Sequence, residues 1–208
     1  MRTGRNDFGS LPLNFLHPET FSNMAASRKK DLPLHLIRRF LEPGPIVLVS
    51  SKWKDETNIM TMGWYTVMEF TPSLVGCVIA GGNRSFDLIR KSGQCVINLP
   101  TLDMAKTTVG IGNCSGGDID KFEKFGLTAQ KSSRVDAPSI KECFASFECI
   151  LHDGRMIKDY NYFIFEVVKA RVATAPKYPK TIHYRGDGIF MTSGNHINLK
   201  SKFISWNL

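Results

Sequence analysis

A short glycine-bearing segment carries residue types that bind phosphate. It reads Gly81-Gly82-Asn83-Arg84-Ser85-Phe86, and it follows an apolar run and precedes a short helical pattern. A helix with Ser85 at its cap position would present free backbone N–H groups and a positive dipole end beside the Arg84 side chain, which suits a phosphate monoester. The alternative is an ordinary strand-to-helix turn, in which glycine supplies a positive φ angle and serine caps the helix.

The segment Asn58-Ile59-Met60-Thr61-Met62-Gly63-Trp64-Tyr65-Thr66 combines polarisable side chains with a central glycine. Glycine within a strand often marks the close approach of a backbone or a ligand, and Met and Trp offer surfaces for a flat aromatic ring. The hydroxyls of Thr61 and Thr66 add hydrogen-bonding groups. Burial of the same stripe in a hydrophobic core is the alternative, and this segment alone favours it.

A third segment, Gly110-Ile111-Gly112-Asn113-Cys114-Ser115-Gly116-Gly117, is rich in glycine but lacks the setting of a dinucleotide-binding fingerprint. It follows a predicted helix, and no βαβ unit surrounds it, so a ligand-facing loop is expected instead. Cys114 is interpreted as an inert thiol because no neighbouring base is evident. The five histidines show no metal-ligand spacing, and no Gly-x-Ser-x-Gly elbow occurs, so neither a metal site nor a hydrolase site is predicted.

Most of the elements that must position these segments are predicted to be strands. Six alternating or apolar runs indicate them, at 46–51, 58–68, 74–80, 95–99, 143–152 and 160–173. Short helices are expected at 31–43, 85–91, 102–109 and 119–125, the last with Asp118 as its cap. Because regular βα alternation is absent, the pattern favours a closed antiparallel sheet, a small β-barrel.

Within the strand 58–68, the alternating side chains of Met60, Met62, Trp64, Thr66 and Met68 are expected to share one face. Residues 1–30 lack either hydrophobic period, and they are predicted to form an N-terminal arm or tail. Residues 31–208 are then expected to form the folded domain.

Composition and charge exclude several classes of protein. The 208 residues are 42% apolar and 22% charged, which is typical of a soluble globular chain, and no apolar run approaches the roughly 20 residues of a membrane span. The net charge of +8 divides into +5 for residues 1–54, −2 for 55–157 and +5 for 158–208. No zinc-finger or RNP pattern accompanies it, so neither nucleic acid nor a membrane is an expected partner, whereas an anionic small molecule is compatible. Five cysteines without a Cys-x-x-Cys pair indicate reduced thiols in the cytoplasm.

Five motifs, in this order, resemble the flavin reductase-like FMN-binding split-barrel proteins, on the flavoredoxin side of that group. The motifs lie at 41–49, 58–64, 83–89, 95–100 and 115–122, and the resemblance runs from about residue 36 to residue 190. It implies a mainly β fold, a six-stranded antiparallel Greek-key split β-barrel with short peripheral helices. It also implies a homodimer that binds FMN non-covalently close to the subunit interface.

The resemblance also implies which residues hold the cofactor. The flavin ring and ribityl chain would be lined by Met60, Thr61, Met62, Gly63, Trp64 and Thr66. The phosphate would be held at the turn that contains Gly81, Asn83, Arg84 and Ser85. The flavin would be covered by Cys114, Ser115, Gly116 and Lys121. Two positions depart from the family pattern, since Gly117 stands where relatives often carry Arg and Arg185 where several reductases have His.

The function implied is that of an NAD(P)H-dependent flavin oxidoreductase, which passes electrons through bound FMN to free flavin or another acceptor. The alternative is a flavoredoxin-type carrier, which exchanges electrons with an electron-transfer protein and turns over nicotinamide slowly or not at all. Because the cofactor performs the chemistry in either case, no catalytic side chain is assigned.

Overall fold

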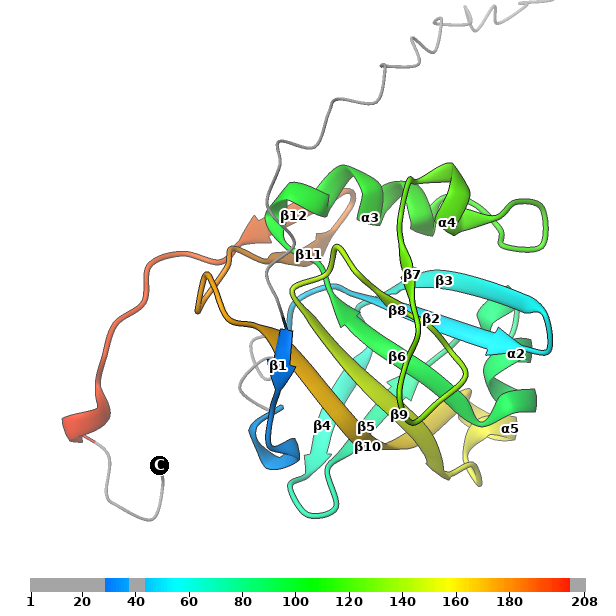
Figure 1. The fold of residues 1–208 in the computed structure, drawn as a ribbon, viewed down its shortest axis with the longest axis horizontal. Helices are drawn as coiled ribbons and strands as arrows, with labels where there is room; N and C mark the ends of the chain where they lie inside the picture. The colour runs from blue at the N-terminus through cyan, green and yellow to red at the C-terminus, as the bar shows by residue number, and fades with distance from the viewer. Residues whose placement is uncertain (1–28, 38–43, 203–208) are drawn as a thin grey trace, which may run out of the picture.

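One antiparallel sheet organises the residues that the computed structural model describes, 29–37 and 44–202 (Figure 1). Its eight strands are β1 (Lys29–Asp31), β2 (Val47–Trp53), β3 (Glu56–Met62), β4 (Tyr65–Glu69), β5 (Leu74–Val78), β6 (Gln94–Leu99), β9 (Ala145–Asp153) and β10 (Tyr162–Ala173). The order across the sheet is β3-β2-β6-β9-β10-β5-β4, and β1 pairs with β10 outside this path. The expected class, a mainly β antiparallel barrel, is confirmed.

The sheet has eight strands rather than the expected six because two segments differ from the sequence analysis. The predicted strand 58–68 breaks after Met62, and its halves form β3 and β4 at opposite ends of the strand order. The expectation that Met60 through Met68 share one face is therefore wrong beyond Gly63. In addition, Lys29–Asp31 pairs with β10, so the expected boundary between arm and domain falls inside β1.

Short helices and two small sheets surround the barrel. The α-helices are α2 (Arg84–Ser92), α3 (Ala105–Gly112), α4 (Lys121–Lys124) and α5 (Ile157–Tyr160). The 3-10 turns are η1 (Leu34–Leu36), η2 (Leu102–Met104) and η3 (Lys200–Lys202). The small sheets pair β7 (Ala129–Gln130) with β8 (Ser139–Ile140) and β11 (Ile182–Gly186) with β12 (Ile189–Thr192). No helix in the described ranges has the length and apolarity needed to cross a bilayer.

The predicted helices match these elements to different degrees. The helix 85–91 is α2, and it ends at Gly93, whose φ of 66° is the left-handed conformation that glycine adopts readily. The helix 102–109 is η2 followed by α3, and the helix 119–125 is the single turn α4. The cap of α4 is Asp120 rather than Asp118, because the Asp120 carboxylate accepts hydrogen bonds from the next turn. Of the helix expected at 31–43, only η1 is seen, and residues 38–43 lie outside the described ranges.

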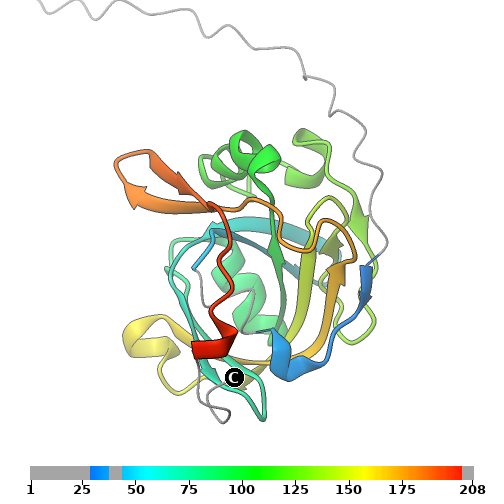
Figure 2. The same ribbon diagram turned by 90° about the vertical axis from the view of Figure 1, so that its left-hand side faces the viewer.

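Alternation along β2 and β3 creates a core on each face of this part of the sheet. Val49 and Met60 point into the barrel core, whereas Leu48 and Ile59 pack with residues of α3 and α4 in a second core. On the barrel side, α2 contributes Ile89 to the core, and its Phe86 ring meets the Phe163 ring edge-on at 5.4 Å. Figure 2 shows the sheet curving around α2. This packing fixes the first turn of α2 beside β3, where the candidate site lies.

Candidate functional site

A cavity of about 290 Å³ lies where β3, the first turn of α2 and the loop after α3 meet; we call it the α2 cavity. It brings together three segments that are far apart in the sequence. Its lining consists of Asn58, Met60, Gly82, Asn83, Arg84, Ser85, Gly112, Asn113, Cys114, Ser115, Gly116 and Lys121. Eight of these were predicted from the sequence: Met60, Asn83, Arg84, Ser85, Cys114, Ser115, Gly116 and Lys121.

Three of the other predicted residues are engaged elsewhere in the fold. The hydroxyl of Thr61 donates to the Thr108 carbonyl of α3 at 2.6 Å. Met62 is buried in the barrel core. A Cβ on Gly63 would lie 2.9 Å from Ile46 Cδ1, so this glycine makes room for a neighbouring side chain of the protein. None of the three lines the α2 cavity, and their contact with a flavin stays a prediction.

The three remaining predicted residues also lie outside this lining. Trp64 sits in the link between β3 and β4 and is 75% exposed. Thr66 lines a different cavity. Gly81 is exposed, and a Cβ there would make only an ordinary contact with the Asn161 side chain. For these residues too, the assignment to the flavin site stays a prediction.

The beginning of α2 supplies hydrogen-bond donors to the cavity. The cap position is Asn83 rather than Ser85, and the Asn83 side chain makes no capping hydrogen bond. Arg84 and Ser85 are thus the first two helical residues, and their backbone N–H groups have no acceptor within the helix. Together with the helix dipole, they form a site of positive potential that favours an anion.

Alternate residues of β3 hold these two helical residues in place. Glu56, Asn58 and Met60 share one face of the strand. The Asn58 Nδ2 donates to Ser85 Oγ at 3.0 Å, and the Arg84 Nε donates to Glu56 Oε1 at 2.6 Å. Sequence reasoning missed Glu56, and it gave no role of its own to Asn58, the first residue of the candidate segment 58–66. Both residues precede Met60 by an even number of positions, so strand alternation places all three on one face.

Lys121 is the buried cation of the cavity. Its ammonium donates to the carbonyls of Ile59 and Ile111, both at 2.9 Å, and so joins β3 to the end of α3. Because β3 ends the strand order, Ile59 can offer its carbonyl to a side chain. Burial lowers the pKa of Lys121, and the nearby Cys114 opposes this effect. An ammonium has three N–H groups, so one is left for a ligand oxygen.

The loop after α3 is seated on Asn58 through a glycine. A Cβ on Gly116 would overlap the carboxamide of Asn58, which is 3% exposed. The Asn58 Oδ1 is buried and has no hydrogen-bond partner. Cys114 lies in the same loop, where its thiol contacts the Gly110 carbonyl at 3.3 Å. At this point of the cavity, the loop backbone at Gly116 therefore lies directly against a side chain that has an unpartnered polar atom.

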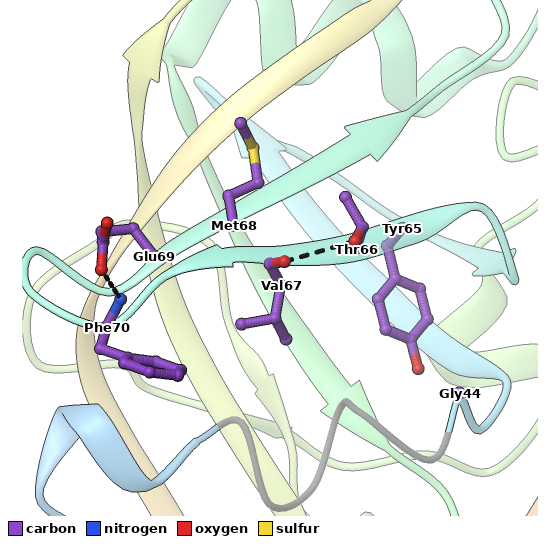
Figure 3. A pocket seen from close by; sticks show the side chains of 7 residues that line it. All are labelled: Gly44, Tyr65, Thr66, Val67, Met68, Glu69 and Phe70. Carbon is purple, nitrogen blue, oxygen red and sulfur yellow. Dashed lines mark hydrogen bonds between the residues drawn. The ribbon is translucent and has the colours of Figure 1, made fainter. Parts of the chain in front are cut away.

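A second cavity, of about 390 Å³, lies along β4 (Figure 3). It is lined by Gly44, Tyr65, Thr66, Val67, Met68, Glu69 and Phe70. The Tyr65 hydroxyl donates to the Pro45 carbonyl at 2.5 Å, and burial raises the pKa of Tyr65. The charged residue of this lining is the acidic Glu69, so the β4 cavity is larger but less suited to an anion than the α2 cavity.

The histidine and arginine near the end of the domain make contacts within the protein. His183 lies in β11, and its ring nitrogens are 3.1 Å from the Gly44 carbonyl and 3.0 Å from the Thr181 hydroxyl. Arg185 is directed to the Met191 sulfur at 3.2 Å. His183 therefore fastens β11 to the start of the barrel. Within the described ranges, no group of three His, Cys, Asp or Glu side chains forms a potential metal site.

Gly116→Ala is expected to lower the free energy of unfolding by roughly 1 to 3 kcal/mol, because the new methyl group forces the loop or Asn58 to move. Gly117→Ala is the matched control. A Cβ at that position meets Ser115 Oγ at 3.5 Å, an ordinary contact, so its effect should stay within about 0.5 kcal/mol. Urea denaturation measures both, and equal stabilities of the two variants would contradict the seating of the loop on Asn58.

Comparison with known proteins agrees with this architecture. The family described as "Flavin reductase like domain" matches residues 38–188. A relative from Escherichia coli K12, the uncharacterized protein YddH, is 30% identical over 185 residues, which cover 82% of this chain and 98% of the relative. An uncharacterized protein from Pyrococcus abyssi is 35% identical over 130 residues, covering 62% of this chain and 74% of that protein.

Solved structures show the same fold. The FMN-binding domain of a flavin reductases-like enzyme from Shewanella baltica OS155 is similar with a TM-score of 0.77 and 26% identity, covering 83% of this chain and 97% of that one. The flavoredoxin of Desulfovibrio vulgaris (Miyazaki F) has a TM-score of 0.68 at 22% identity, over 74% of this chain and 89% of that one. From its sequence match and its barrel, this chain belongs to the flavin reductase like domain family.

Proposed function

We propose that this protein binds FMN non-covalently, with the phosphate in the α2 cavity, and transfers electrons from NAD(P)H to free flavin or another acceptor. The observation that carries the proposal is the convergence of two free backbone N–H groups, Arg84 and Lys121 on one cavity. The FMN-binding domain from Shewanella baltica supports it as a relative with the same fold. We keep the cytoplasm as the expected compartment, since all five cysteines are free thiols and four are buried.

The residues of the α2 cavity fit a phosphorylated ligand. The donors at the start of α2 and the ammonium of Lys121 match the oxygens of a phosphate. Gly116 lets the loop backbone pack closely against Asn58, and both residues line the cavity. A volume of about 290 Å³ suits the phosphate with part of the ribityl chain, so the flavin ring would extend beyond the cavity.

Bound FMN would supply the redox chemistry, since a flavin accepts electrons from nicotinamide and passes them on. The residues of this chain would bind and orient it. The first N–H groups of α2 and the free N–H groups of Arg84 would donate hydrogen bonds to the phosphate. The hydroxyl of Ser85 can also donate to it, because Asn58 already donates to the Ser85 oxygen. The ring nitrogens of His183 both have partners, so we assign that residue no proton transfer.

Anaerobic mixing of the FMN-loaded protein with NADH or NADPH tests the proposed reaction. Prompt bleaching of the visible flavin band is expected with at least one of the two nucleotides. Reduction by a protein donor alone would contradict NAD(P)H dependence and favour the electron-carrier alternative. A protein that takes up no FMN would contradict both functions.

Arg84→Ala should weaken FMN binding by roughly 1.5 kcal/mol, the lower end for a hydrogen bond to a charged group, because Glu56 and Asp87 already offset part of the Arg84 charge. Riboflavin, which lacks the phosphate, should bind as it does to the unsubstituted protein. Arg90→Ala, on the exposed part of the same helix, is the control and should leave both affinities unchanged. Flavin fluorescence quenching measures the affinities, and equal losses for the two ligands would contradict the phosphate assignment.

We also propose a homodimer, in which a second copy covers the β11–β12 sheet. These two strands pair with no further strand of the described residues. Ile182 and His183 attach the hairpin to the start of the barrel, and its remaining part projects from the barrel in Figure 2. They expose Tyr184, Ile189 and Met191. An isolated two-stranded sheet is only marginally stable, and exposed apolar side chains on it favour a protein partner.

Light scattering after size exclusion should give twice the mass of the 23.4 kDa chain. Ile189→Asp should shift the protein towards the monomer. Ile189 is 62% exposed in the single chain, and the substitution would place a charge where the second copy is proposed to cover an apolar side chain. Tyr160→Asp on α5, at a similarly exposed position away from the hairpin, should remain dimeric. A monomeric unsubstituted protein would contradict this part of the proposal.

A further inference from the structure

The guanidinium of Arg84 is held by the carboxylate of Glu56, which does not itself line the α2 cavity. The Arg84 Nε donates to Glu56 Oε1 at 2.6 Å, and Nη2 forms a second, very short hydrogen bond to Glu56 Oε2. This two-point contact fixes the plane of the guanidinium as well as its position. Asp87, on the next turn of α2, is more distant, with its Oδ2 3.9 Å from Arg84 Nη1.

The position of Glu56 is itself fixed by the backbone. Glu56 is the first residue of β3 and pairs with Trp53 across the hairpin, so only two residues connect the strands. One of them, Lys54, has a φ of 54°, as tight hairpin turns require. Two residues further along β3, Asn58 holds Ser85, so consecutive residues of α2 are anchored by alternate residues of the strand.

This arrangement changes how Arg84 can act on an anion. Glu56 and Asp87 carry two negative charges beside Arg84, and Lys91 adds a second positive charge close enough to act on Glu56. The cluster therefore has no net positive charge with which to attract phosphate. The contact with Glu56 uses Nε and Nη2. Asp87 Oδ2 lies 3.9 Å from Nη1, beyond hydrogen-bond distance, so the N–H groups of Nη1 can still donate to a ligand. Arg84 must therefore contribute through well-placed donors, and their placement depends on Glu56. The hydrogen bond between them lowers the pKa of Glu56 and raises the pKa of Arg84.

We propose that Glu56 is a positioning residue that gives the α2 cavity its preference for FMN over riboflavin by directing the free edge of Arg84 towards the phosphate. The inference rests on the proposed FMN site and adds a determinant of specificity to it. Glu56 does not line the cavity, so its effect must pass through Arg84.

The test compares FMN and riboflavin affinities of Glu56→Gln, Glu56→Asp and Asp87→Asn, measured by fluorescence quenching. Glu56→Gln should weaken FMN binding roughly tenfold, about the contribution of one hydrogen bond, and leave riboflavin binding unchanged. Glu56→Asp keeps the charge but shortens the side chain, so it should also weaken FMN binding. Asp87→Asn removes the same unit of charge near the same guanidinium without breaking the two-point contact, and it should not weaken FMN binding.

Tighter FMN binding by Glu56→Gln, or unchanged binding by Glu56→Asp, would show that charge outweighs placement and would overturn the inference. Combination with Arg84→Ala provides a further check, because Glu56→Gln should have no additional effect once Arg84 is absent. The same loss in both backgrounds would contradict an action through Arg84. Thermal unfolding of each variant verifies that it is folded.

Failure of this inference can be told apart from failure of the proposed function. If the unsubstituted protein binds no FMN, both are overturned. If it prefers FMN to riboflavin and Glu56→Gln retains the same preference, the FMN site stands and only the role of Glu56 is rejected.

Discussion

The contact between β3 and the first turn of α2 is the constraint on which the candidate site depends. Asn58 holds Ser85, Glu56 holds Arg84, and the barrel core holds the buried face of the helix behind them. The start of a helix is an anion site only when its N–H groups and side chains are held in a fixed arrangement. A strand supplies this fixed arrangement here, because its alternate side chains all reach the same side.

Arg84 contributes less to the positive potential of the α2 cavity than the sequence alone indicates. Carboxylates near Arg84 offset its charge, whereas the ammonium of Lys121 donates to two uncharged peptide carbonyls. The dipole of α2 adds positive potential to the cavity, as Lys121 does. Among the described residues, the lining of the larger β4 cavity contains no lysine, no arginine and no helix start, and its Glu69 would repel a phosphate. Chemistry rather than volume therefore distinguishes the two cavities.

Sequence reasoning found what local patterns encode. Glycines, a cation and a helix start within six residues indicated the turn at 81–86, and alternation indicated most strands. It did not find the break after Met62, because the alternation of residue types continues across Gly63. In the structure, the chain passes there from β3 to β4, which lie at opposite ends of the strand order. It also missed Glu56 and the role of Asn58, whose partners lie 28 and 27 residues away, since such pairings are set by the packing of α2 on β3.

The most direct measurement of the central claim is an FMN titration of the isotope-labelled protein followed by its backbone amide NMR signals. The account predicts that the largest shifts belong to Arg84, Ser85 and the loop 112–117, which surround the α2 cavity. Shifts concentrated instead at Gly44 and along Tyr65 to Phe70 would place the ligand in the β4 cavity and contradict the account.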